Sequence, residues 1–218
     1  GGQSTRPGSD RVTAAEELNR VLPVFQIIKE NYPSVFLSID TYHATVASET
    51  VAAGIDMVND ISAGDMDANM LSTVASLRVP FIAMHMQGTP DTMQDKPTYD
   101  NIAIEVVDYF IQKTAACKAA GITDIIIDPG FGFGKSLNEN HELLQKLEHL
   151  HLLGAPLLVG VSRKSMITKK LNCSPDEALN GTSILQTLAY TKGARIFRVH
   201  DIKEVKELIL LLAAQDLH

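Results

Sequence analysis

Hydrophobic and polar positions in this chain follow two alternating periods. Short apolar runs of strand length recur along it, and amphipathic stretches of helix length separate them. Strands joined by helices in this way run parallel, so all of them end at the same rim of the sheet. The pattern predicts an α/β fold of the (β/α)8 barrel type, a TIM barrel. We expect six strands, at residues 35–39, 56–59, 81–85, 124–128, 157–161 and 195–200.

The stretches between the strands carry helix start and stop signals. Thr13 and Glu16 have the spacing of a capping box, and the helix that they open continues past Pro23. Gly54 and Gly121 follow amphipathic segments, where glycine commonly caps the end of a helix. We expect helices at about residues 13–31, 43–53, 67–77, 99–120, 137–151, 164–171, 176–192 and 202–214.

Six strands are fewer than the eight that close a barrel of this kind. The chain also opens on Gly1 and Gly2, within what its composition marks as a loop. We therefore expect an N-terminal part with about two strands to be absent from this sequence. No linker or low-complexity segment divides residues 1–218, and we interpret them as a single barrel domain that is incomplete at its N-terminus.

Composition and charge narrow the range of partners. The 218 residues are 45% hydrophobic, which is enough for a real core, and the formal net charge is −7. A negative balance argues against nucleic acid or an anionic membrane surface as a partner. The two cysteines have no metal-ligand spacing, and no apolar run approaches the roughly 20 residues that span a bilayer. We expect a soluble, cytoplasmic protein.

Polar residues end the predicted strands, and Asp128 is the sharpest candidate among them. A carboxylate there can accept two parallel hydrogen bonds from the amidine-like edge of a heterocycle, or it caps the turn that follows. In the next loop Phe133 stands between two glycines, where it would lie over a ligand ring or pack under the loop. Asp40 and Asn59 end two other strands and would read polar ring atoms or form turns.

A basic group ends a further strand. Ser162, Arg163 and Lys164 bring a hydroxyl, a guanidinium and an ammonium to one place. This combination suits the recognition of oxygen atoms or anions, although it is also found at a solvated helix start. Lys164 could instead form a Schiff base, as in barrel aldolases, with Arg163 depressing its pKa.

The last predicted strand carries a pair of candidate anion-binding residues. Arg198 and His200 alternate along it and therefore face the same way. Together with Arg6 in the opening loop, they could hold a phosphate-type group with a fixed charge and a titratable donor. For His85, at the end of another strand, a ligand role and a plain structural role both stay open.

These residues together resemble dihydropteroate synthases, a family of folate-pathway enzymes with a (β/α)8 barrel. Each matching stretch is weak alone, but the stretches keep the family's order across the whole chain. The resemblance rests on residues 1–8 (Gly-Gly-Gln-Ser-Thr-Arg-Pro-Gly), 38–41, 59–62, 84–88, 128–135 (Asp-Pro-Gly-Phe-Gly-Phe-Gly-Lys), 160–165 and 198–201.

The resemblance implies a pterin-binding transferase that is a target of sulfonamides. It would condense 6-hydroxymethyl-7,8-dihydropterin diphosphate with p-aminobenzoate to give 7,8-dihydropteroate and pyrophosphate. The residues that the resemblance implies in catalysis are Asp40, Lys164, Arg198 and His200. Those implied in substrate binding are Thr5, Arg6, Pro7, Asp40, Asn59, Asp128, Phe133, Ser162, Lys164, Arg198 and His200.

The implied roles divide these residues among three parts of the substrates. Asp128 and Asn59 would hold the polar edge of the pterin, and Lys164 would contact the side of its ring that carries oxygen. Asp40 would stabilise positive charge near a ring nitrogen. The other implied contacts are Phe133, Ser162, Thr5, Arg6 and Pro7 for p-aminobenzoate, and Arg198 and His200 with Arg6 for the diphosphate.

Mg²⁺ is the implied cofactor, and a homodimer is a further expectation. The Asn that contacts Mg²⁺ in the family belongs to the N-terminal part that we expect to be absent, so no residue of this chain is assigned to the metal. Gln3 also stands where Glu is usual in this family's motif. On these grounds we expect the chain as printed to be inactive by itself.

Two other functions compete with the synthase. A methyltetrahydrofolate-binding barrel module of a methyltransferase would present its ligand to another protein. Two basic groups argue against it, because a ligand without a diphosphate has little use for both: Ser162-Arg163-Lys164 and Arg198-His200. A lysine-dependent aldolase would form a Schiff base on Lys164, which borohydride would trap.

Overall fold

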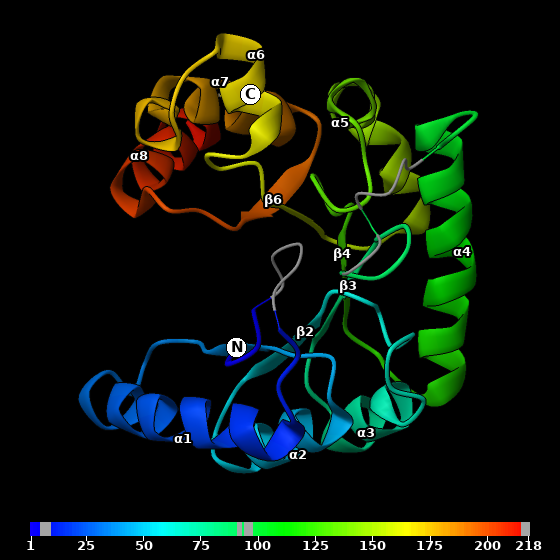
Figure 1. Ribbon diagram of the computed structural model, residues 1–218, viewed down its shortest axis with the longest axis vertical. Helices are drawn as coiled ribbons and strands as arrows, with labels where there is room; N and C mark the ends of the chain where they lie inside the picture. The colour runs from blue at the N-terminus through cyan, green and yellow to red at the C-terminus, as the bar shows by residue number, and fades with distance from the viewer. Residues whose placement is uncertain (5–9, 91–92, 94–97, 215–218) are drawn as a thin grey trace.

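The six expected strands form one parallel sheet. The structure is a computed structural model that describes residues 1–4, 10–90, 93 and 98–214, and its strands lie side by side in chain order. The sheet curls, and helices cover its outer surface (Figure 1). The strands are β1 (Ser38–Asp40), β2 (Met57–Asp60), β3 (Phe81–Met84), β4 (Ile125–Asp128), β5 (Leu157–Val159) and β6 (Ala194–Phe197).

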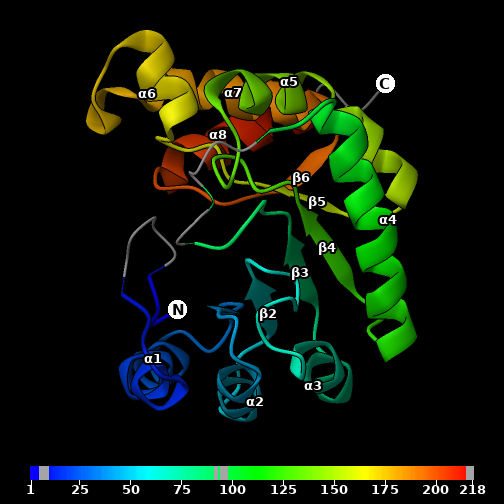
Figure 2. The ribbon, with the colours of Figure 1, turned by 45° about the vertical axis from the view of Figure 1, so that its right-hand side comes forward.

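Helical segments connect each strand to the next and return the chain to the same end of the sheet. Figure 2 shows α1, α2, α3 and α4 on the outside of the sheet, and the strands curving inside them. This curled half-barrel confirms an α/β fold of the TIM-barrel type. The helices are α1 (Ala14–Asn31), α2 (Ala44–Ala52), α3 (Met70–Leu77), α4 (Ile102–Ala120), α5 (Leu137–Gln145), α6 (Ser165–Leu171), α7 (Leu179–Thr191) and α8 (Ile202–Ala213), with 3-10 turns η1 (Leu147–Leu153) and η2 (Pro175–Glu177).

Alternation along the strands produces two packed layers. Phe81 and Ala83 of β3 belong to the main core, which fills the space between the sheet and the helices. Ile82 lies between them in the sequence and points to the other face, where it packs with Ile126 of β4 and Leu158 of β5. This second cluster fills the concave side of the sheet beneath its rim.

Strand pairing brings polar residues together at that rim. Asp40 at the end of β1 lies beside Asn59 of β2, and Asp128 at the end of β4 lies beside Met84 of β3. The backbone N–H of Thr41 donates to the carbonyl oxygen of Asn59 at 2.9 Å, which extends the pairing by one residue. The polar ends of parallel strands therefore meet at one edge, as the sequence pattern predicts.

The first helix confirms most of its sequence signals. The Thr13 hydroxyl accepts a hydrogen bond from the backbone N–H of Glu16 at 3.2 Å, and the helix continues through Pro23 to Asn31. The reciprocal half of the predicted capping box is wrong, because the Glu16 carboxylate pairs with Arg20 one turn later. Two exposed side chains four residues apart on a helix readily make such a pair.

The predicted strand at residues 35–39 is wrong in its position. β1 begins only at Ser38, and the side chain of Phe36 is 85% exposed. Ser38 pairs with Met57, the first residue of β2, so β1 begins where the neighbouring strand supplies hydrogen-bond partners. An apolar run predicts that a strand is near, but pairing decides where it starts.

Several other boundaries also differ from the prediction, among them the end of β5 at Val159 and the starts of α3 at Met70 and α4 at Ile102. β6 ends at Phe197, so Arg198 and His200 lie in the segment beyond it and not on the strand. The helix expected at 137–151 divides into α5 and η1, because the backbone of Lys146 leaves the helical region (φ −108°, ψ 19°). The helix expected at 176–192 likewise divides into η2 and α7.

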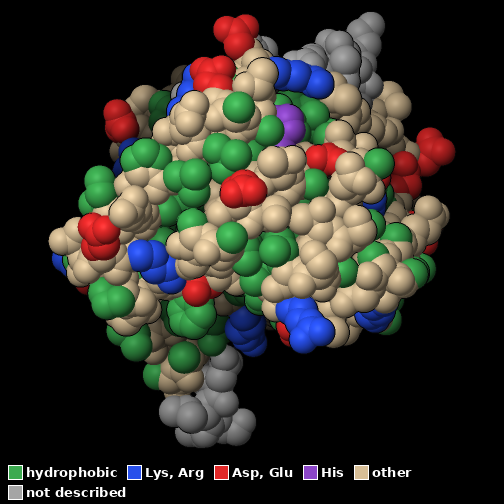
Figure 3. Space-filling view, turned by 90° about the horizontal axis from the view of Figure 1, so that it is seen from below, with side chains coloured by type: hydrophobic (Ala, Val, Ile, Leu, Met, Phe, Trp, Pro, Cys, Tyr) green, Lys and Arg blue, Asp and Glu red, His purple; other side chains and the backbone are tan. Residues whose placement is uncertain are grey.

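The described helices show no sign of a membrane-spanning segment. Within residues 1–4, 10–90, 93 and 98–214, no helix is long and apolar enough to cross a bilayer. The face seen from below in Figure 1 mixes hydrophobic with charged side chains (Figure 3). The cytoplasmic location stays a prediction.

Candidate active site

A hollow of about 280 Å³ lies at the rim where β3 to β6 end. It is open on one side and combines charged side chains with an aromatic ring and a glycine. Most of the strand-end residues that the sequence singles out from β4 onward therefore face one space. The lining residues are Met84, Asp128, Phe133, Gly160, Ser162, Lys164, Arg198, Val199 and His200.

Asp128 supplies a buried carboxylate to this hollow. It is 5% exposed, and its Oδ1 accepts a hydrogen bond from the backbone N–H of Gly130 at 2.8 Å. Burial raises the pKa of the Asp128 carboxyl, whereas the Lys164 ammonium, the Gly130 N–H and the Arg198 guanidinium oppose that rise. The turn-capping contact and a place in the hollow are thus compatible, because one carboxylate oxygen makes the cap.

Lys164 brings an ammonium to the same hollow. Its Nζ donates to the carbonyl oxygen of Phe131 and lies 4.9 Å from the centre of the Phe133 ring. Burial lowers the pKa of Lys164 to about 8, with Asp128 opposing the shift and Arg198 adding to it. The ring of Phe133 therefore lies at the hollow beneath a cation and not packed away under its loop.

Arg198 reaches across the curled sheet to the end of β1. Its Nη2 is 2.6 Å from Oδ2 of Asp40, although the two residues are 158 positions apart in the chain. The other oxygen of Asp40 is buried without a hydrogen-bond partner, and so is Oδ1 of the neighbouring Asn59. Neither Asp40 nor Asn59 lines the hollow, and Asp40 is linked to it through Arg198. Buried acceptors without partners are rare in folded proteins, so these two oxygens are available to a donor from a ligand.

Ser162 and His200 form a hydrogen-bonded pair at the edge of the hollow. Oγ of the buried Ser162 is 2.9 Å from Nδ1 of the exposed His200, and the backbone N–H of His200 also approaches that hydroxyl at 3.3 Å. The pair fixes the imidazole ring with its Nε2 side away from Ser162. Arg198 and His200 both line the hollow, although the strand that was expected to align them ends earlier.

Arg163 does not belong to the hollow, which corrects the expectation of a basic trio there. Its guanidinium donates to Asp201 at 2.6 and 3.2 Å and to Asp176 at 3.0 Å. The backbone of Arg163 is left-handed (φ 54°), so the turn sends its side chain away from those of Ser162 and Lys164. Arg163 therefore ties this turn to the start of α8.

Two buried polar residues support the loop after β4, and the sequence pattern gives no role to either. The Lys135 ammonium donates to the carbonyl oxygens of Gly130 at 2.9 Å and Phe133 at 3.0 Å. Asn140 accepts from the backbone N–H of Gly132 at 2.6 Å and donates to the carbonyl oxygen of Lys135 at 3.0 Å. The motif gave Lys135 no visible partner, because those partners are backbone atoms placed by the turn.

Gln3 and Glu17 support the opening loop in a similar way. The Gln3 amide donates to the carbonyl oxygens of Ser4 at 2.7 Å and Asp10 at 3.0 Å, and it accepts from the N–H of Val12. The buried Glu17 carboxylate accepts from the N–H of Gln3 at 3.2 Å. Gln3 thus joins both ends of the segment that carries Thr5, Arg6 and Pro7, which themselves lie outside the described residues.

His85 and Asp60 are buried close to the site but do not line the hollow. Burial and the Lys135 ammonium lower the pKa of His85 to about 2, so its ring is neutral, and its Nδ1 has no partner. The ring packs against Tyr109 in a T-shaped contact, with centroids 4.8 Å apart. Asp60 accepts from the N–H and hydroxyl of Ser62 at 2.7 Å, while burial raises its pKa to about 6. These contacts favour a structural role for both.

The described residues include no ready-made cluster of metal ligands. Among them, no three His, Cys, Asp or Glu side chains are grouped in a way that could hold one. No described residue is assigned to Mg²⁺.

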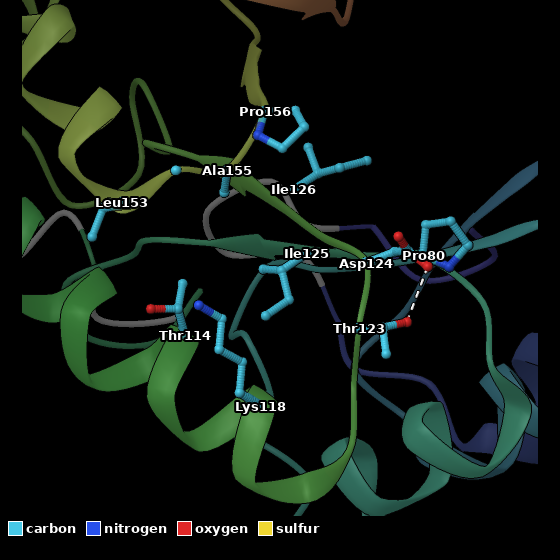
Figure 4. A pocket seen from close by; sticks show the side chains of 11 residues that line it. Pro80, Thr114, Lys118, Thr123, Asp124, Ile125, Ile126, Leu153, Ala155 and Pro156 are labelled. Atoms are coloured by element: carbon cyan, nitrogen blue, oxygen red, sulfur yellow. Dashed lines mark hydrogen bonds between the residues drawn. The ribbon is translucent and has the colours of Figure 1, made fainter.

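A second hollow, of about 340 Å³, lies at the opposite end of the same strands. Figure 4 shows Pro80, Ile126 and Pro156 around it, with Lys118 and Thr114 reaching in from α4. Its hydroxyl and carboxylate groups are already engaged, because Thr123 donates to Asp124 and Thr114 to backbone carbonyls. Although it is the larger hollow, it offers a ligand few free polar groups.

Comparison with known proteins decides among the functions that this geometry allows. The profile of the family described as pterin binding enzyme matches residues 1–200. The dihydropteroate synthase of Escherichia coli is 44% identical over 216 residues, which are 98% of this chain and 76% of that protein. This chain belongs to the dihydropteroate synthase family.

Solved structures of other dihydropteroate synthases agree with the fold. The Yersinia pestis enzyme, crystallised with a sulfonamide drug complex, matches this chain with a TM-score of 0.95 at 40% identity. The match covers 100% of this chain and 79% of that enzyme's chain. The Xanthomonas albilineans enzyme with 4-aminobenzoic acid has a TM-score of 0.92 at 39% identity over 100% of this chain and 78% of its own. These relatives favour the synthase over the methyltetrahydrofolate module and the aldolase.

Proposed function

We propose that the hollow at the rim of the sheet performs the dihydropteroate synthase reaction. The substrates are 6-hydroxymethyl-7,8-dihydropterin diphosphate and p-aminobenzoate, and the products are 7,8-dihydropteroate and pyrophosphate. The observation that carries the proposal is the convergence of Asp128, Lys164 and Arg198 on one hollow, with unpartnered oxygens of Asp40 and Asn59 beside it. An aldolase would need only the lysine.

The pterin ring binds at the buried end of the hollow in this proposal. Its 2-amino group and the adjacent ring N–H form a planar donor edge, which matches the two oxygens of the Asp128 carboxylate. The free Oδ1 of Asn59 accepts a further ring donor, and the Lys164 ammonium donates to the ring's oxygen-bearing side. Phe133 supplies an aromatic face at the mouth of the hollow. p-Aminobenzoate binds there, and a sulfonamide would take the same place.

Arg198 and His200 hold the diphosphate. Both are exposed at the entrance of the hollow, where a polyanion keeps part of its hydration. Arg198 pairs with Asp40 in the ligand-free structure, so the diphosphate competes with that carboxylate for the guanidinium. Once released, the Asp40 carboxylate lies where it stabilises positive charge on the pterin.

The chemical step is a displacement at the methylene carbon of the pterin. The bond between this carbon and the diphosphate oxygen breaks with its electron pair, and Arg198 stabilises the departing anion. The amine of p-aminobenzoate forms the new C–N bond with its lone pair and then loses one proton. No protein nucleophile takes part, which agrees with a Lys164 ammonium that is held by a backbone carbonyl oxygen.

The family resemblance implies Mg²⁺ as a cofactor of this reaction. A divalent cation would neutralise charge on the diphosphate, in the same sense as Arg198. Chelation with EDTA followed by titration with Mg²⁺ measures whether binding of the pterin diphosphate depends on the metal. The binding of free pterin serves as the comparison, because it carries no diphosphate.

We extend the proposal to a homodimer formed through α7 and α8. These helices expose a set of large apolar side chains and border a groove of about 520 Å³. Apolar area of this kind commonly marks a protein interface. Sedimentation equilibrium tests it, and Leu211→Glu should shift a dimer to monomers. The exposed apolar residues are Leu179, Ile184, Leu188, Ile202, Leu210 and Leu211.

Calorimetry with 6-hydroxymethylpterin and its diphosphate tests the proposed function directly. We expect both to bind this chain, the diphosphate more tightly, and p-aminobenzoate to bind only when pyrophosphate or the diphosphate substrate is present. Pyrophosphate release that depends on p-aminobenzoate then measures turnover. A chain that binds no pterin would contradict the proposal, and pterin binding without pyrophosphate release would reduce it to a binding function.

A further inference from the structure

Lys135 is a buried cation that the proposed chemistry does not use. Its side chain is 5% exposed, and its Nζ donates to the carbonyl oxygens of Gly130 at 2.9 Å, Phe133 at 3.0 Å and His85 at 3.3 Å. His85 follows β3, whereas Gly130 and Phe133 belong to the loop after β4. One ammonium therefore joins the ends of two neighbouring strands at the base of the site.

The two backbone segments that Lys135 joins lie in direct contact with each other. Gly130 has a left-handed backbone (φ 68°), and a Cβ atom there would lie 1.9 Å from the carbonyl oxygen of His85. The two segments thus pack backbone against backbone, with carbonyl oxygens in a place closed to water. Without Lys135 these oxygens would lose a charged donor that no solvent molecule replaces.

The same loop carries Phe133 and contacts Asp128, and both of these residues line the hollow. The N–H of Gly130 donates to Asp128, and the carbonyl oxygen of Gly130 accepts from Lys135, so the peptide units on either side of this residue link the cation to the carboxylate. Phe133 presents its ring to the hollow while its carbonyl oxygen is held by Lys135 on the other side. Displacement of the loop would therefore move both groups.

Lys135 also acts on Asp128 through its charge. Positive charge on Lys135 lowers the pKa of Asp128, in the same direction as Lys164 and Arg198 and against the effect of burial. Asp128 and Glu139 in turn favour the charged form of Lys135, whereas burial and Lys164 lower its pKa to about 7. A buried carboxylate with nearby cations stays available as an acceptor over a wider pH range.

We propose that Lys135 is a positioning residue for pterin binding. It fixes the loop from Gly130 to Gly134 so that Phe133 faces the hollow, and its charge favours the ionised form of Asp128. This inference rests on the proposed function, since it concerns how the pterin site is held in shape. Lys135 touches no substrate and takes no part in the bond exchange.

Two substitutions separate the hydrogen bonds of Lys135 from its charge. Lys135→Met fills a similar volume without donors or charge, and Lys135→Gln keeps an NH₂ donor without the charge. The Kd of 6-hydroxymethylpterin is measured by calorimetry from about pH 5 to about pH 8 for both variants and the unmodified chain. Thermal unfolding of the same samples reports whether each variant is folded.

We expect Lys135→Met to weaken pterin binding by about tenfold or more, because the loop loses its charged donor. Lys135→Gln should recover part of that loss. In both variants the fall in affinity at acid pH should move upward by about half a pH unit, because Asp128 loses a neighbouring positive charge and protonates more readily. This shift in the pH profile is a result that a purely structural role would not produce.

Lys113→Met is the matched control. Lys113 is also largely buried, with its side chain 12% exposed, but it pairs with Asp65 at 2.6 Å on the outer side of the sheet. Its loss should leave both the pterin Kd and the pH profile unchanged. A folded Lys135→Met or Lys135→Gln variant with the affinity and pH profile of the unmodified chain would overturn the proposal, and Lys135→Gln decides alone if Lys135→Met does not fold. An unmodified chain without pterin affinity would instead contradict the proposed function itself.

Discussion

One aspartate directly precedes β4 and another ends it, and their surroundings differ in exposure, charged neighbours and free acceptor atoms. Asp124 is exposed and already accepts from the Thr123 hydroxyl at 3.1 Å, beside a hollow of about 340 Å³. Asp128 is 5% exposed, has Lys164 and Arg198 nearby, and borders a hollow of about 280 Å³. The smaller hollow has the chemistry of a site, so the state of its polar groups identifies it better than its volume does.

The last strand repeats the contrast with two arginines. Arg195 within β6 donates to the backbone carbonyl oxygens of Tyr190 and Ala194, and its guanidinium lies over the Tyr190 ring at 4.5 Å. Arg198, just past the end of β6, reaches Asp40 across the mouth of the sheet. Only the second guanidinium can exchange its partner for a ligand without disturbing the backbone around it.

The largest effect on ligand affinity should come from replacing Asp128 at the end of β4, with the same change at Asp124 before the strand as the comparison. We expect Asp128→Asn to weaken the binding of 6-hydroxymethylpterin by about 100-fold, because an amide cannot accept two hydrogen bonds from a planar donor edge. Asp124→Asn should leave the affinity unchanged. Calorimetry measures both, and thermal unfolding checks that the variants fold. Equal affinities for the two variants would remove the distinction between the ends of β4.

The two arginines offer the next contrast. Arg198→Ala should weaken the binding of the pterin diphosphate by about 30-fold and that of the free pterin by less than about threefold, since the guanidinium holds the anion. Arg195→Ala should leave the ratio of the two affinities as it is. The measurement is the Kd of each ligand for each variant, and equal losses of both ligands in Arg198→Ala would contradict the assignment to the diphosphate.

A pH titration sharpens the comparison through the lysines of the two hollows. The ammonium of Lys164 has a pKa of about 8, so pterin affinity should fall as the pH rises through that value and the donor loses its charge. Lys164→Met should bind about tenfold more weakly at neutral pH, and its affinity should decline less at alkaline pH, with the remaining decline due to Lys135, whose pKa burial lowers to about 7. Lys118→Met, beside the other hollow, should keep the full decline. A Lys164→Met variant with an undiminished decline would assign the titration to another group.

The smallest effect concerns the aromatic face at the mouth. Phe133→Leu should raise the Kd of p-aminobenzoate by about three- to fivefold, because it removes a ring contact but keeps an apolar side chain. Leu153→Ala, a loss of apolar surface at the opposite hollow, serves as the control and should leave that Kd unchanged. The measurement requires saturating pyrophosphate and pterin, and an unaltered Kd in Phe133→Leu would exclude Phe133 from the second substrate's site.

The strand ends were predictable because their signal is local. An apolar run followed by a polar residue, as in Ile127 and Asp128, marks both the strand and its last side chain. Parallel connectivity then brings all such endings to one rim without any knowledge of distances. The family motifs added the substrates, which the polar residues alone did not specify.

The start of β1 and the direction of Arg163 were not predictable, because their causes lie elsewhere in the chain. Phe36 looks like a strand residue, but β2 begins its pairing only opposite Ser38. Arg163 stands between two residues of the hollow in the sequence, yet its left-handed backbone and the carboxylate of Asp201 take it out of the site. Partners distant in sequence leave no trace in a local pattern.

The ion pair of Asp40 and Arg198 was only partly predictable from the sequence. The sequence predicts each residue as a part of the site, in separate roles on the pterin and the diphosphate. It does not predict that they bond to each other, since 158 positions separate them. Only the curl of the sheet, which brings the end of β1 opposite the end of β6, makes that contact possible.

The amide of Gln3 holds the opening loop without using a charge. Its nitrogen donates to the carbonyl oxygens of Ser4 and Asp10, and its oxygen accepts from the N–H of Val12. An amide keeps a donor and an acceptor at any ordinary pH, whereas the glutamate that is usual in this family's motif would have to be protonated to donate to a carbonyl oxygen. These three contacts of Gln3 therefore do not depend on the acidity of the solution.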